Sequence, residues 1–388
     1  MTDLSTNAPQ DGGLDTLQEL MGQLTKDFDG LLMDPALDSL AKIFREKERR
    51  PPGVVSPSSF LYMRTLDADL GDRPLAPGRH WHAPDLNLTP VSNPGQITTD
   101  LEAGESYEIA CTLRNRGDLR VPNAQVELFL TDPTLGFDTR HALNLTGATP
   151  LGGTVPGFGQ TTLTFPYKVP NSESGHKCLF ARAYSFMPQE IPVDPYVLDP
   201  RMDRRIAQQN LNIAAAEEPF PFQIVHPLNG RVVVDIQPIA AAEAQRFPQI
   251  NQRGLEVRDA REFPIEELSK QIENVDGADV EVTFDDGGLQ LSSKGEGPGP
   301  DERLATDQAM SRAVAARATG EMGYAEFKRL QDVYRADRSR RGVTRFMLHP
   351  PDFGLDPGTV LGLNVTARDP DLRNAALGGI VLFLTAPR

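Results

Sequence analysis

Two stretches decide the fold of this chain, Tyr107-Glu-Ile-Ala-Cys-Thr-Leu-Arg-Asn115 and Gly175-His-Lys-Cys-Leu-Phe-Ala-Arg-Ala-Tyr184. In the first stretch apolar and polar side chains alternate, which is typical of a strand with one buried face. The second stretch has apolar side chains on both faces, so we expect it to be covered on both sides. Further strand-like runs surround these two, with turn residues between them roughly every ten positions, and this spacing is typical of a β-sandwich.

The chain of 388 residues is longer than one ordinary core supports, because domains average about 150 residues. We therefore predict a mainly β protein with two tandem immunoglobulin-like β-sandwiches, N-terminal amphipathic helices and a helical insertion in the second sandwich. The predicted parts follow one another along the chain: a disordered tail and amphipathic helices at 1–50, a connector rich in proline and glycine at 51–80, the first sandwich at 81–216, and the second sandwich at 217–388 with its insertion at 301–337.

Alternating apolar residues predict the positions of the remaining strands. For the first sandwich we expect further strands at 86–91, 124–131, 163–167 and 206–213, and for the second at 222–225, 231–236, 280–284, 288–292, 343–348, 359–367 and 379–385. The insertion is rich in alanine and has apolar residues at helical spacing. It is expected to form one long helix, or two helices broken near Gly320 and Gly323.

The overall charge narrows the classes of partner. A formal net charge of −15, from 54 acidic and 39 basic residues, argues against non-specific binding to nucleic acid or to an anionic membrane. No stretch approaches the roughly 18 apolar residues of a membrane span. The first residues lack the basic and apolar regions of a secretory signal. We expect a cytoplasmic protein, with leaderless export left open.

An apolar stripe runs through 14–44, because leucine and phenylalanine recur at steps of three and four, as on one face of a helix. Such a face needs something to cover it. One alternative is that it packs on the protein's own domains, and the other is that it forms an oligomer or docks on a protein partner. The candidate partner-contact residues are those of the stripe and of the helical insertion: Leu17, Leu20, Leu24, Phe28, Leu31, Leu40 and Phe44, with Phe327, Leu330 and Tyr334.

The chain has two cysteines, Cys111 and Cys178. They fall where strands B and F of an immunoglobulin-like sandwich would be, and those strands commonly face each other across the core. Two interpretations stay open: a disulfide between B and F, or a pair of buried thiols that act as small hydrophobic residues.

Three runs together resemble a CARDB-type domain, an immunoglobulin-like module of bacteria and archaea. They are Asp85-Leu-Asn-Leu, then Ala103-Gly-Glu followed by Cys111-Thr-Leu-Arg-Asn-Arg-Gly-Asp118, and Val126-Glu-Leu-Phe-Leu. The resemblance covers residues 81–213, and the turn Asn115-x-Gly117 is its most specific part. It implies a module that binds or spaces other modules and is not itself catalytic. One departure is His176, which stands where many immunoglobulin folds carry a tyrosine two residues before the second cysteine.

No motif points to a reaction. The chain lacks a Gly-x-Ser-x-Gly elbow, a Walker loop and a His-Glu-x-x-His run. His80 and His82 form a lone pair without further ligands at metal-site spacing. We therefore expect no catalytic residues, no cofactor and no metal, and a non-catalytic structural or binding component of a larger protein assembly. The first alternative is a soluble ligand- or glycan-binding module with its site on loops near Trp81, Tyr184 and Tyr196. The second, less favoured, is an enzyme whose site lies between the domains.

Overall fold

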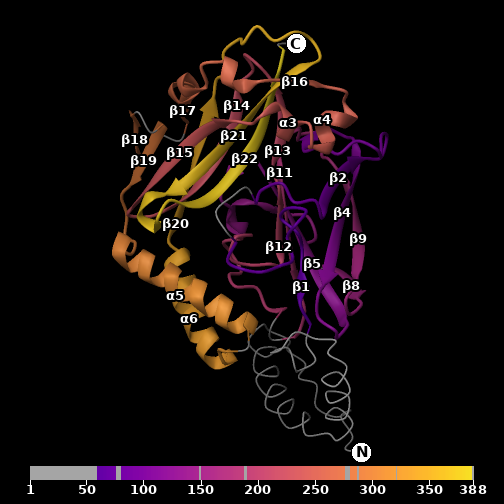
Figure 1. Cartoon of the computed structure of the whole chain (residues 1–388), viewed down its shortest axis with the longest axis vertical. Helices are drawn as coiled ribbons and strands as arrows, with labels where there is room; N and C mark the ends of the chain where they lie inside the picture. Colours follow the sequence, from indigo (N-terminus) through magenta and orange to yellow (C-terminus); the bar gives the residue numbers. More distant parts are fainter. Residues whose placement is uncertain are drawn as a thin grey trace, which may run out of the picture.

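The structure is a computed structural model that describes residues 59–75, 80–147, 150–187, 190–275, 280–285, 288–319 and 321–386. It is mainly β, as predicted, and its strands form several sheets (Figure 1). The N-terminal helices predicted within 1–50, with all their candidate contact residues, lie outside the described residues.

The N-terminal β region contains two sheets that pack face to face. One sheet has β4 in its middle and consists of β1 (Leu61–Tyr62), β4 (Ser106–Asn115), β2 (Leu86–Pro90) and β9 (Gln160–Lys168). The other consists of β12 (Ile206–Gln209), β11 (Cys178–Tyr184), β5 (Val121–Thr131), β7 (Leu143–Asn144) and β8 (Leu151–Val155), while β3 (Asp100–Leu101) and β10 (Gly175–His176) form a separate pair. The shared core contains Ile109 and Leu113 from β4, Val126 and Leu128 from β5, and Leu179 from β11.

The C-terminal β region also contains two sheets with a common core. Its larger sheet has the order β13 (Leu211–Ala215), β22 (Ala375–Thr385), β21 (Thr359–Asp369), β15 (Gly230–Pro238), β19 (Gly288–Ser293) and β18 (Val280–Asp285), with β16 (Glu256–Arg258) added beside β21. The smaller sheet has the order β17 (Ile272–Asn274), β20 (Arg341–Leu348), β14 (Phe220–Pro227) and β6 (Thr134–Leu135). Phe222 and Phe346 of the smaller sheet belong to the same core as Leu363 and Leu382 of the larger one.

The helical insertion forms two helices, α5 (Pro300–Thr319) and α6 (Tyr324–Arg338), which lie side by side in Figure 1. The break falls in the segment of Gly320 and Gly323, and Gly323 is the N-cap of α6. The two-helix alternative is therefore correct, because glycine lowers helix propensity at the break. We call α5 and α6 together the helical hairpin. The shorter helices are α3 (Ala241–Ala244), α4 (Pro248–Gln252), η1 (Thr139–His141), η3 (Ala260–Glu262), η4 (Ile265–Gln271) and η5 (Pro370–Leu372).

The predicted strand 206–213 is not one strand. Its first half is β12, which pairs with β11, but its second half is β13, which joins the larger C-terminal sheet beside β22. The division falls at Asn210, whose fully buried amide donates to the carbonyls of Thr134 and Gly379. Its backbone N–H donates to Trp81. The amide of Asn210 thus bonds to β6 and β22 of the C-terminal β region and its backbone bonds to Trp81, at the point where the chain passes from β12 to β13.

Trp81 fills the apolar contact between the two β regions. Its side chain is 2% exposed and packs with Leu211, Val381 and Phe383. Gly379 lies directly against the indole, since a Cβ atom there would be 2.2 Å from the ring. The contact therefore requires a glycine at that position.

Candidate functional site

Among the described residues, a group of buried and half-buried charges lies where the helical hairpin meets both β regions. It is built from three parts of the chain: the loop that follows β11, the two hairpin helices, and the start of β20 with η5. We call it the ionic junction. Its residues are Asp194, Asp199 and Arg201 from the loop, Arg303, Asp307, Tyr334, Asp337 and Arg338 from the helices, and Arg341, Asp369 and Asp371 from the C-terminal β region.

The centre of the ionic junction is the pair of Asp199 and Arg338. A guanidinium nitrogen of Arg338 lies 3.2 Å from the Asp199 carboxylate, and it also bonds to the Tyr334 hydroxyl. Burial alone raises the pKa of Asp199, but the guanidinium groups of Arg201 and Arg338 outweigh burial and hold that pKa well below its usual range. Burial also raises the pKa of Tyr334, so its hydroxyl stays protonated at neutral pH.

Two further ion pairs attach α5 to its surroundings. Arg201 lies 3.3 Å from Asp307 of α5, so the N-terminal β region is bound to this helix. Arg303 of α5 pairs with Asp369 at 2.5 Å and with Asp371 at 3.0 Å, so the C-terminal β region is bound to the same helix. Both β regions therefore contact the hairpin through buried charges.

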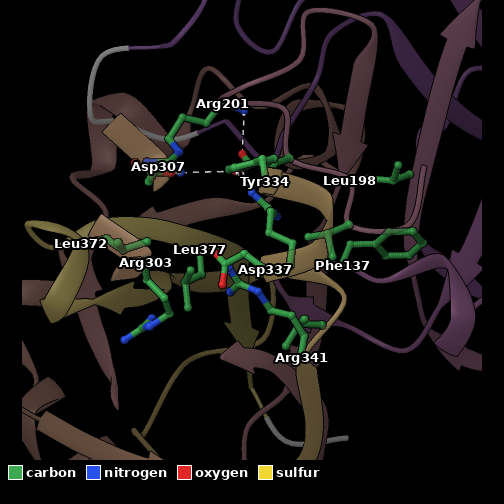
Figure 2. Close-up of a pocket in the computed structure, with 15 residues that line it drawn as sticks. Phe137, Leu198, Arg201, Arg303, Asp307, Tyr334, Asp337, Arg341, Leu372 and Leu377 are labelled. Atoms are coloured by element: carbon green, nitrogen blue, oxygen red, sulfur yellow. Dashed lines mark hydrogen bonds and ion pairs between the residues drawn. The ribbon is translucent and has the colours of Figure 1, made fainter. Parts of the chain in front are cut away.

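A small cavity lies inside the ionic junction. Tyr334 lines this cavity, and Figure 2 shows it between Arg201 and Asp307 on one side and Asp337 and Arg341 on the other. The cavity measures about 20 Å³, which is room for about one ordered water and not for a small-molecule substrate.

Several arginine nitrogen atoms around this cavity lack a hydrogen-bond partner within the part of the chain that the structure describes. The Nε atoms of Arg201, Arg303 and Arg338 have no hydrogen-bond partner among the described residues. Arg341 makes no ion pair within 4.0 Å in the described ranges, and burial together with the nearby Arg338 lowers its pKa to about 10. Ordered water in the cavity would satisfy the free Nε atoms, since water bonds to buried polar groups that the protein leaves unpaired. Chemically, the arrangement holds elements together and offers no nucleophile with an adjacent base.

The candidate contact residues of α6 are placed differently from one another. Phe327 and Tyr334 are buried and pack with Val193, Met310 and other residues of the same chain. Leu330 is partly buried against the same cluster. In this conformation these side chains stabilise the hairpin's contact with the loop after β11, and their contact with a partner stays a prediction.

Cys111 and Cys178 are both free and buried, so the disulfide is not formed. They do not face each other. Cys111 points into the core between the two N-terminal sheets, 3.3 Å from the sulfur of Met63, whereas Cys178 lies on the opposite face of its sheet with Phe137 and Phe180. The reason is the strand period of two: Leu179 and Ala181 take the inward positions of β11. Burial raises the pKa of both thiols.

The residues named for the ligand-binding alternative are not gathered into one site. Trp81 is buried between the β regions, while Tyr196 is exposed and Tyr184 is half-buried. The Nε2 atom of His82 lies 3.3 Å from the Oε1 atom of Gln249, and burial lowers the pKa of His82. Among the described residues, no three histidine, cysteine, aspartate or glutamate side chains come together as a metal site would require. The helices in the described ranges are too short or too polar to span a bilayer.

The sequence reasoning missed the ionic junction, although a repeated motif marks part of it. The motif is Asp-x-Arg, in which the aspartate accepts from the backbone N–H two residues later and pairs with the arginine side chain. It occurs in this form at Asp199-Pro-Arg201 and Asp203-Arg-Arg205 in the loop, and also at Asp138-Thr-Arg140 and Asp259-Ala-Arg261. Two copies within seven residues signal a loop held by its own charges.

Comparisons with known proteins show similarity to solved structures only. No model of a known protein family matches the chain, and no curated protein matches it. A CARDB domain from Pyrococcus furiosus, solved in complex with di-metal ions, is 13% identical and covers 36% of this chain and 93% of its own, with a TM-score of 0.20. A β-glucosidase from Listeria innocua is 14% identical over 33% of this chain and 16% of its own, with a TM-score of 0.18. The CupB6 tip adhesin from Pseudomonas aeruginosa is 8% identical over 79% of this chain and 97% of its own, with a TM-score of 0.17.

The first of these structures carries the family name that the sequence pattern suggested for 81–213. The likeness concerns the fold of about a third of the chain. With TM-scores this low, none of the three establishes a family or an activity for this chain.

Proposed function

We propose that this chain is a non-catalytic structural component of a larger protein assembly, built from two immunoglobulin-like sandwich modules and contacting its partners through the apolar stripe at 14–44 and the helical hairpin. The observation that supports it best is the ionic junction. Most of its charges pair with one another and attach the hairpin to both β regions, and its cavity has room for about one water.

A rigid hairpin fits this role. Arg201 and Arg303 attach α5 to opposite β regions, and the side chain of Arg335 on α6 donates to the backbone carbonyls of Pro192 and Val193. A helix pair fixed in this way presents its outer face in a defined direction, which a protein contact requires. Among the described residues of the hairpin, Val333 of α6 is a large apolar side chain that is exposed to solvent.

The test is the solution mass of the full chain by light scattering at several concentrations, together with capture of binding proteins from the native host. Leu24→Asp with Phe28→Asp interrupts the stripe, and Lys26→Asp changes the net charge by the same amount on the stripe's polar side. We expect an oligomer or a captured partner with the unchanged chain and with Lys26→Asp, and a monomer without a partner for the double variant. A chain that is monomeric and partnerless in all three forms contradicts the proposal.

A further inference from the structure

Four exposed apolar side chains lie on segments of the N-terminal β region that hydrogen bonds and packing connect. Phe158 is 72% exposed and Leu70 is 58% exposed, and Leu66 and Phe186 are exposed as well. We call these four residues the entry face, because the described chain begins beside them at Ser59.

Hydrogen bonds and packing through Asn115 and Phe60 connect the segments that carry the entry face. The buried Asn115 side chain accepts from the backbone N–H of Phe60 and of Gly117, and the carbonyl of Gly117 in turn accepts from the N–H of Phe158. The Phe60 ring packs against Gly71, the residue after Leu70, since a Cβ atom there would be 2.7 Å from the ring.

Phe186 is connected to the same segments. It follows Ser185, whose N–H donates to the carbonyl of Glu190. The Glu190 carboxylate accepts from the Ser59 hydroxyl and from the N–H of Leu61, each at 2.9 Å. The start of the described chain and the entry face are therefore parts of one hydrogen-bonded unit.

Phe158 is the residue that the fold explains least. It adopts a φ of 51°, in the left-handed region that bulky side chains rarely occupy, and its ring is outside every core cluster of the described residues. Asparagine or glycine would make this turn at lower cost. Strained and exposed bulky residues are typical of contact sites.

The chain itself supplies an apolar segment with the reach to cover the entry face. The stripe at 14–44 ends fifteen residues before Ser59. An extended tether of that length spans up to about 50 Å, so the stripe reaches any point of the patch. An amphipathic segment in water is stabilised chiefly by burying its apolar side.

We propose that the apolar stripe of residues 14–44 docks on the entry face of its own chain, with Phe158 at the centre of the contact. The inference rests on the stripe's role as the contact element of the proposed function, and it states where the stripe lies when no partner holds it. A partner would then have to displace the stripe from Phe158.

The test measures how fast a maleimide labels Leu70→Cys, a variant that places a thiol on the entry face and keeps Phe158, in the full chain. The native thiols are buried and their pKa values are raised, so they label slowly and the new cysteine reports alone. The labelling rate is compared with the stripe intact, with Leu24→Asp and Phe28→Asp, and with Lys26→Asp as the charge-matched control. Val275→Cys, at an exposed position of the C-terminal β region, reports on a surface away from the entry face.

We expect the double variant to raise the rate at Leu70→Cys by about tenfold, which corresponds to ~1.4 kcal/mol of docking free energy. Lys26→Asp should leave that rate unchanged, and Val275→Cys should label equally fast in all backgrounds. Equal rates at Leu70→Cys with and without the stripe leucine and phenylalanine overturn the inference. Protection that appears only at high protein concentration also overturns it, because a second copy would then be the occupant.

Separate measurements test the docking and the proposed function. Oligomers or captured partners are measured on the unlabelled chain, whereas labelling reports the contact within one chain. A stripe that protects Leu70→Cys in a chain without any partner supports the docking and contradicts the assembly role.

Discussion

The two buried contacts in this molecule, one between the β regions and one beneath the hairpin, differ in chemical character. The contact between the β regions is apolar and centres on Trp81 beside Gly379, whereas the contact beneath the hairpin is ionic and centres on Arg338 beside Asp199. Apolar burial stabilises in proportion to the area removed from water and depends little on pH. A buried ion pair contributes little net stability, because desolvation offsets the attraction, yet loss of one partner is costly. The β regions are therefore held chiefly by packing, whereas the hairpin is held by the apolar cluster around Phe327 and by ion pairs that charge neutralisation can release.

The largest effect is expected at the apolar junction. Trp81→Ala removes a large buried ring and should lower the free energy of unfolding by about 4 kcal/mol, measured by urea denaturation. Trp81→Phe should lose much less, because it keeps an aromatic ring and removes an indole N–H that has no hydrogen-bond partner in the described part of the chain. Equal losses for the two variants would show that the ring is not what joins the regions.

The next effect concerns the ionic junction. Arg338→Met leaves Asp199 and the Tyr334 hydroxyl with fewer partners in a buried site, and should cost about 3 kcal/mol. The loss should be local, so amide hydrogen exchange should speed up in α5 and α6 while β21 and β22 stay protected. Exchange that rises equally in helices and sheets would mean that the hairpin and the β regions unfold as one unit.

Lowering the pH should weaken the ionic junction and leave the apolar contact between the β regions intact, without any substitution. The folded pKa of Asp199 is depressed, so its contribution is fully present above the usual carboxyl pKa of about 3.9 and is lost as the pH falls below it. The carboxyl group of Asp337 responds to pH in the opposite direction, because burial raises its pKa. Its ionisation as the pH rises therefore does not stabilise the hairpin. We expect hairpin amides to lose protection below about pH 4 while those of β22 keep theirs, in exchange rates corrected for pH.

Free carboxyl groups titrate between roughly pH 5 and pH 3. Corrected exchange rates of the hairpin amides that stay constant over that range would contradict this assignment. Arg338→Met is the control. Its hairpin should show a weaker pH dependence, since one of the two guanidinium groups that lower the pKa of Asp199 has been removed while Arg201 stays.

Local patterns in the sequence predicted the strands and helices well. The alternation around Cys111 predicted β4, and apolar spacing with a glycine break predicted α5 and α6. These signals are local, because a strand's period of two and a helix's glycine break can be read within a dozen residues.

The contacts between distant segments could not be predicted in the same way. Nothing near Asn210 signals that the strand changes sheets there, since its partners are Thr134 and Gly379. The direction of Cys178 depends on which face of β11 the second sheet covers. The ionic junction joins charges more than a hundred residues apart, such as Arg201 and Asp307, and composition alone would place those charges at the surface.

The smallest predicted effect compares an exposed ion pair of α6 with the buried Arg338 of the same helix. Lys328 and Asp332 of α6 form an ion pair of 2.8 Å on the solvent side, four residues apart, with the aspartate side chain more than half exposed. Lys328→Met, which makes the same kind of replacement as Arg338→Met, should cost only about 0.3–0.5 kcal/mol, because water and salt screen exposed pairs. Urea denaturation of the two variants side by side measures the difference. If the Lys328 variant lost as much stability as the Arg338 variant, helix charge in general, and not burial beneath the hairpin, would explain the cost of removing Arg338.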